Sequence, residues 1–129
     1  MCRRAVAADV VRGRIAVLRG AVAAHAAGAG LTGRRLEDFV LAVNEIATNV
    51  VLYGGGRGRL RLWAHDDRLW CEVTDEEPGL PPEWTRPART PSRHDPGGRG
   101  LWLTRLLCDH LTIVSTPGGT SVTLSARTG

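Results

Sequence analysis

The spacing of apolar residues predicts two helices in the first half of the chain. An alanine-rich segment from Asp9 to about Ala27 carries valine, leucine and isoleucine at helical spacings, and two glycines follow it. Thr32 is suited to cap a second helix, because its hydroxyl can accept a bond from a free backbone N–H. The apolar residues of this second segment recur every 3.6 positions and share one stripe, which comprises Leu36, Phe39, Val40, Val43, Ile46, Ala47 and Val50. Three glycines at 54–56 end it.

The next segment changes from helical spacing to alternation. Apolar residues alternate with polar ones from Leu60 to Ala64 and again from Leu69 to Val73, with Asp66 and Asp67 between them. Two alternating runs joined by a short polar turn are typical of an antiparallel hairpin. We therefore expect the core face of the second strand to carry Leu69, Cys71 and Val73.

The second half begins with an aperiodic stretch rich in proline and glycine, at about 76–98. A loop of this length inside a compact domain usually has a function of its own. Helical spacing returns from Gly100 to about Asp109, and two strands at about 111–116 and 120–126 flank the turn Pro117-Gly118-Gly119.

Four strands and three helices without strict β-α-β alternation favour an α+β fold. We expect a two-layer sandwich with the helices on one face of a mixed β-sheet. The length of 129 residues suits one domain spanning the whole chain, 1–129, and no internal repeat divides it.

Composition and charge exclude several classes of protein. No apolar run approaches the roughly 20 residues that span a bilayer, and Asp9, Arg12 and Arg14 interrupt the only candidate for a secretory signal. We therefore expect a cytoplasmic protein that does not enter a membrane. The formal charge is +4, but the 17 basic residues, all arginine, are scattered rather than interleaved with aromatic residues. Direct nucleic-acid binding is not expected.

The cysteines and histidines indicate no metal or disulfide framework. Cys2, Cys71 and Cys108 are odd in number and widely spaced, so we expect reduced thiols. The four histidines lack the spacing of a metal cluster. The four tryptophans are interpreted mainly as packing residues, apart from Trp84 in the long loop.

Glu45 and Asn49 form the first candidate for chemistry. They lie four residues apart on the second helix, so their side chains share one face, one turn apart. That face is nearly opposite the apolar stripe, which predicts that both side chains point away from the sheet. Either this is a solvated outer face, or the amide oxygen ligates Mg²⁺ and the carboxylate deprotonates a nucleophile.

Two further segments carry candidate binding groups. Asp75 continues the core face of its strand, where a carboxylate needs a hydrogen-bond donor, although an aspartate here also suits a turn. The run Gly98-Arg99-Gly100-Leu101 leads into a helix start. Free N–H groups and flexible glycine can hold a phosphate there, with Arg99 adding charge, although a plain loop has the same composition.

Taken together and in this order, these segments resemble a known family. Glu45-Ile-Ala-Thr-Asn49, Asp75-Glu-Glu-Pro-Gly79, Gly98-Arg-Gly-Leu101 and Gly119-Thr120 are similar to the N box, G1 box, G2 box and final threonine of the GHKL superfamily of ATP-binding domains. The resemblance covers nearly the whole chain. The compact form is similar to the anti-sigma-factor serine/threonine kinases of bacteria.

The resemblance implies a role for each motif residue. Glu45 would be the general base, Asn49 the Mg²⁺ ligand and Asp75 the acceptor for the adenine amino group. Gly79 belongs to the G1 box, and Gly98, Arg99, Gly100 and Leu101 would surround the phosphates of ATP. Thr120 would support the adenine end, and residues 80–97 would form a lid within the loop 76–98.

The same resemblance implies protein partners. These would be a sigma factor and an anti-sigma-factor antagonist whose serine or threonine is phosphorylated, and a homodimer is compatible with it. Glu77 stands where the G1 box usually has its first glycine, and Tyr53 stands where many relatives have histidine. Glu77 favours one alternative, a module that keeps the fold and sequesters a partner without using ATP. The usual first strand also looks truncated, since only about eight residues precede the first helix, and a missing edge strand would affect dimer formation.

Overall fold

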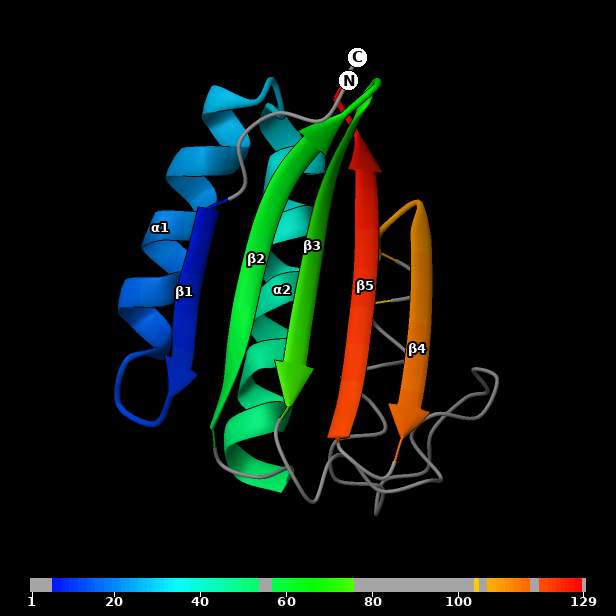
Figure 1. The fold of residues 1–129 in the computed structure, drawn as a ribbon. Coiled ribbons are helices and arrows are strands. Elements are labelled where there is room, and N and C mark those ends of the chain that lie inside the picture. Colours follow the sequence, from blue (N-terminus) through cyan, green and yellow to red (C-terminus); the bar gives the residue numbers. More distant parts are fainter. Residues whose placement is uncertain (1–5, 54–56, 76–103, 105–106, 117–118, 129) are drawn as a thin grey trace, which may run out of the picture.

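The computed structural model describes residues 6–53, 57–75, 104, 107–116 and 119–128. Its elements in chain order are β1 (Val6–Val11), α1 (Ile15–Gly28), α2 (Gly33–Tyr53), β2 (Arg57–His65), β3 (Arg68–Asp75), β4 (His110–Thr116) and β5 (Gly119–Arg127). Both helices lie behind a single sheet (Figure 1). This arrangement confirms the predicted α+β sandwich with helices on one face.

The sheet has the strand order β1-β2-β3-β5-β4, and each neighbouring pair is antiparallel. The prediction of a mixed sheet was therefore wrong for the described strands. The predicted hairpin is confirmed, since β2 and β3 pair across the two-residue turn at Asp66 and Asp67. Asp66 adopts a positive φ of 55° there, a conformation that aspartate tolerates better than most residues.

The start of the chain departs from its prediction. Val6–Val11 is an edge strand that pairs with β2, and the helix begins only at Ile15. Alanine is compatible with either structure, so the alanine-rich composition concealed the alternation that buries Val10 on the core face. Gly13, with φ of 84°, makes the turn between them. The first strand is thus present, and the edge of β2 is covered.

The core lies between α2 and the inner face of the sheet. The predicted stripe of α2 is confirmed, with Phe39, Val43, Ile46, Ala47 and Val50 all buried. The strands contribute their alternating residues, namely Leu60, Leu62, Leu69, Cys71, Val73, Val122 and Leu124. Removal of this apolar surface from water is the main stabilising contribution.

The remaining predictions for the second half are tested only in part. The loop at 76–98 and most of the third helix fall outside the described residues. Thr104 and Leu107 are helical, and the Cys108 N–H donates to the Thr104 carbonyl at 3.2 Å. The last turn of that helix is therefore where the sequence placed it, and it ends slightly before Asp109.

Two further predictions concern the state of the cysteines and the lack of a membrane-spanning segment. Cys71 and Cys108 are free thiols. Burial, and to a smaller extent the nearby charge of Glu72, raises the pKa of Cys71 above its ordinary range. Among the residues that the structure describes, no helix combines the length and apolar character needed to cross a bilayer.

Candidate functional site

Asp75 occupies the centre of one end of the sheet. It is the last residue of β3, and it lies in register between Gly58 of β2 and Thr120 of β5. Asp75 is 4% exposed and Thr120 3% exposed, so both are buried. The prediction that Asp75 continues the core face of its strand is confirmed. Neither residue is without an interaction partner.

Gly58 lets helix α2 approach the sheet beside Asp75. A Cβ on Gly58 would meet the carbonyl oxygen of Thr74 and would come within 3.1 Å of Val50 Cγ1. Only glycine fits between this strand and the helix without a shift of the backbone. The contact holds the last turns of α2 next to the strand that pairs with Asp75. Gly58 was not among the predicted site residues, although a glycine inside an alternating strand is a signal for close backbone approach.

Asn49 precedes Val50 and is drawn into the same packing. It is only 3% exposed, whereas Glu45 is half-buried. The side chain of Asn49 is thus not on a solvated outer face, which was one interpretation of the Glu45 and Asn49 pair. Helix α2 contacts α1 as well as four strands of the sheet. A helix covered on several sides has a smaller solvent face than one apolar stripe suggests.

The fold gathers the described motif residues at one end of the sandwich. Figure 1 shows the end of α2, the end of β3 and the start of β5 at this same end. Glu45 and Asn49 come from α2, Asp75 from β3 and Thr120 from β5. Four residues singled out from separate parts of the sequence are thus brought to one region.

Thr104 is the first residue after the glycine segment that the structure describes. Gly79, Gly98, Arg99, Gly100 and Leu101 lie outside the described residues, as do Glu77 and the predicted lid. Thr104 comes three positions after Leu101, is fully buried, and its hydroxyl donates to the carbonyl of Ala42 at 3.5 Å. Soon after the glycine segment, the chain therefore packs against α2 at Ala42, about one turn before Glu45.

The polar groups at this end suit two parts of a magnesium nucleotide, the adenine amine and the metal ion. A buried carboxylate at Asp75 can accept bonds from an exocyclic amine, and the amide oxygen of Asn49 is a hard ligand for Mg²⁺. No cluster of three or more histidine, cysteine, aspartate or glutamate residues that could hold a metal occurs in the described ranges.

Comparison with known proteins identifies the class. Residues 7–126 match the histidine kinase-like ATPase domain family, and the chain belongs to that family. A solved structure of the RsbU and RsbW domains of Rv1364c from Mycobacterium tuberculosis has a similar fold, with a TM-score of 0.69 and 19% sequence identity. The match covers 97% of this chain and 32% of that one, so the chain spans about a third of that protein's length. No curated protein sequence matches the chain significantly.

Proposed function

We propose that the chain binds ATP with Mg²⁺ at the Asp75 end of the sandwich and acts as an anti-sigma factor with serine/threonine kinase activity. The observation that carries this proposal is the burial of Asp75 in register between Gly58 and Thr120, at the same end as Asn49. A carboxylate has about four lone-pair sites, so the buried Asp75 can accept a bond from an adenine amine in addition to its interaction within the protein.

Each residue then has one task in holding the nucleotide. Asp75 accepts the hydrogen bond of the adenine amine, and Thr120 supports it from the adjacent strand. Asn49 supplies the amide oxygen for Mg²⁺. Gly98 and Gly100 surround the phosphates, and the guanidinium of Arg99 neutralises part of their charge. Gly79 of the G1 box and Leu101 also contact the nucleotide.

Glu45 serves the transfer rather than the binding. When bound, ATP supplies the phosphoryl group that passes to a serine or threonine hydroxyl of an antagonist protein. Glu45 accepts the proton of that hydroxyl, one helical turn from Asn49. The sigma factor is the second partner in this proposal, and its binding does not require the carboxylate of Glu45.

A second candidate is a sequestering module that does not use ATP, and Glu77 in the G1 box favours it. Incubation with γ-labelled ATP and candidate antagonists separates the two. The kinase predicts label on an antagonist serine or threonine, dependent on Mg²⁺. Tight binding of a sigma factor with no labelling of any antagonist, together with nucleotide binding gained in Glu77→Gly, would establish the sequestering module instead.

A further inference from the structure

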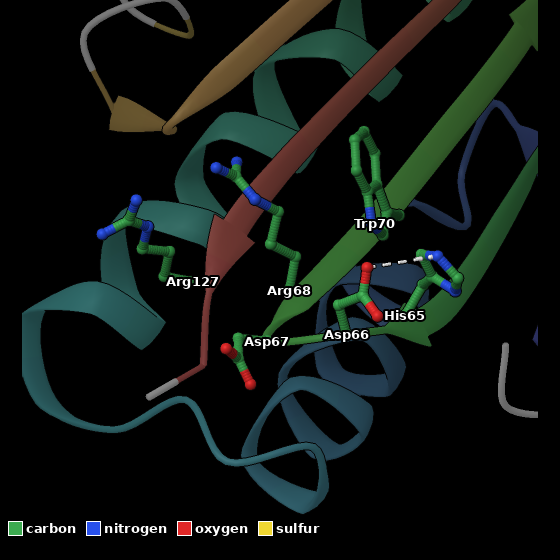
Figure 2. Close-up of a pocket in the computed structure, with 6 residues that line it drawn as sticks. All are labelled: His65, Asp66, Asp67, Arg68, Trp70 and Arg127. Carbon is green, nitrogen blue, oxygen red and sulfur yellow. Dashed lines mark ion pairs between the residues drawn. The ribbon is translucent and has the colours of Figure 1, made fainter. Parts of the chain in front are cut away.

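A pocket lies at the opposite end of the sandwich from Asp75 and the candidate nucleotide site. The turn between β2 and β3 and the end of β5 enclose about 450 Å³, lined by His65, Asp66, Asp67, Arg68, Trp70 and Arg127 (Figure 2). The length of β3, from Arg68 to Asp75, separates this pocket from the candidate nucleotide site by about 23 Å at the usual rise of a strand. The two sites therefore do not share residues.

Two arginines lie side by side in the lining of this pocket. Arg68 and Arg127 are register partners on β3 and β5, and their guanidinium groups extend to the same side in Figure 2. Like charges directly opposite on neighbouring strands are unfavourable unless an anion lies nearby. Arg68 Nη1 donates to the Ser125 hydroxyl at 3.2 Å, and the Arg127 guanidinium makes no ion pair with any described residue. Most of their donors stay available.

Aromatic side chains beside the arginines pack against one another. Trp63 and Trp70 stack with 6.2 Å between ring centroids and 7° between planes, and His110 meets Trp70 edge-on at 6.0 Å. Trp70 Nε1 and His65 Nδ1 are both buried without a hydrogen-bond partner. A buried polar atom without a partner is unusual in a folded protein, and the indole N–H of Trp70, which can only donate, calls for an acceptor.

The acidic residues of the pocket limit what anion it can take. The Asp66 carboxylate pairs with His65 Nε2 at 3.3 Å, and both aspartates lie at the turn, below the guanidinium groups in Figure 2. The neighbouring Arg35 is already paired with Asp109 at 3.3 Å. The two aspartates offset much of the charge of the two arginines, so recognition rests on the forked geometry of the guanidinium donors, which matches a carboxylate.

The wider sheet face agrees with an acidic partner. Five arginines project outward from the strands against two acids, and the five are Arg57, Arg59, Arg61, Arg68 and Arg127. Asp9 lies opposite Arg59, and Glu72 pairs with Arg61 at 3.0 Å. The unbalanced positive charge disfavours a second copy of the same face and favours a partner that brings carboxylates.

We propose that this pocket binds a glutamate or aspartate side chain from an acidic segment of a partner protein. The carboxylate lies between the guanidinium groups of Arg68 and Arg127, which offer a forked set of donors. An apolar residue next to it in the partner packs on the stacked Trp63 and Trp70. The proposal does not depend on nucleotide, so the affinity for the segment is the same with and without ATP.

The test uses the whole chain, labelled with ¹⁵N, and a blocked peptide of alternating leucine and glutamate. Addition of the peptide should shift the indole N–H resonance of Trp70, assigned through Trp70→Phe, and added salt should weaken the binding. Arg127→Gln should weaken it by about tenfold, as expected for loss of a charge-assisted contact. Arg19→Gln on the exposed face of α1 removes the same charge elsewhere and should leave the affinity unchanged.

Three further probes can overturn the proposal. A copy of the peptide with glutamine in place of glutamate should not bind, and equal binding of this copy would contradict the role of the carboxylate. Inorganic phosphate or a single-stranded oligonucleotide that shifts Trp70 at concentrations where the glutamate peptide does not would also contradict it. Arg127 is exposed, so unfolding of Arg127→Gln is not expected, and its circular dichroism spectrum verifies the fold.

Discussion

Asp75 and Thr120 lie directly opposite each other on β3 and β5, both buried, although 45 positions separate them in the sequence. This pairing brings the start of the predicted G1 box next to the final threonine. The antiparallel β3–β5 ladder therefore sets the geometry of the candidate adenine pocket. A ladder of eight register pairs, from Arg68 to Asp75, is a rigid support for such a contact.

The first prediction concerns the carboxylate of Asp75. Asp75→Asn should weaken ATP binding by about 1–3 kcal/mol, because an amide replaces a charged acceptor that lies out of water. Isothermal titration calorimetry measures the change. Asp9→Asn, an exposed aspartate on β1, is the matched control and should bind ATP as the parent does. Equal affinity of the parent for ATP and GTP would argue against recognition of the adenine amine by Asp75.

The second prediction separates Glu45 from Asn49. Glu45→Ala should retain ATP affinity within a few-fold and lose about 10² to 10⁴ in the rate of phosphotransfer to an antagonist, as is typical when a general base is removed. Asn49→Ala should lose both Mg²⁺-dependent binding and transfer. Binding and labelling assays on the same preparations measure both effects. A Glu45→Ala protein that transfers phosphate at the parent's rate would rule out the assigned role.

The third prediction tests the close approach at Gly58. Gly58→Ala should destabilise the fold by about 1–3 kcal/mol, because the added methyl group meets the Thr74 backbone and Val50. Gly20→Ala is the control within α1, where an added Cβ meets nothing within 4 Å, and it should stabilise by about 0.5–1 kcal/mol. Urea unfolding compares the two. Similar effects of the two substitutions would show that α2 does not press on β2 at this point.

The fourth prediction is a pH dependence caused by Cys71. Burial, with a smaller effect of Glu72, raises the pKa of this thiol above the ordinary value of 9.0. Above pH 9 the unfolded thiol loses its proton while the folded thiol keeps it, so the stabilising contribution is complete below pH 9 and declines as pH rises further. The slope should approach about 1.4 kcal/mol per pH unit.

Cys71→Ala supplies the comparison for that slope. Unfolding in urea under reducing conditions at several pH values above 9 should show a shallower decline in the variant, by the equivalent of one proton. Cys108 and the arginines are common to both proteins and cancel. Parallel pH profiles for parent and variant would mean that Cys71 is not shielded from water in the folded state.

The sequence predicted the parts of the fold that depend on local periodicity. The stripe on α2 and the alternation around Asp66 and Asp67 each bury a set of residues that can be read directly from spacing. The strand at Val6–Val11 was not recognised, because the alanine-rich composition of this part of the chain favours a helix by intrinsic propensity. The insertion of β5 between β3 and β4 is a long-range pairing, and no local signal specifies it.

The candidate site likewise combines features that the local sequence predicts with features that depend on tertiary contacts. Glu45 and Asn49 were predicted as site residues from their spacing on a helix, Asp75 from its place on the core face of a strand, and Thr120 from the resemblance to a known family. The burial of Asn49 was not predicted, since burial depends on tertiary packing and not on spacing along the helix. The part played by Gly58 depends on a contact between a strand and a helix, and only the folded structure shows that contact.

The measurement that tests the central claim most directly is a calorimetric titration of the whole chain with ATP, with and without Mg²⁺. The buried acceptor at Asp75 and the amide of Asn49 predict binding in the micromolar to millimolar range that Mg²⁺ strengthens and that GTP does not reproduce. The absence of both heat and any thermal shift at millimolar ATP with Mg²⁺ would contradict the assignment of this end of the sandwich as a nucleotide site.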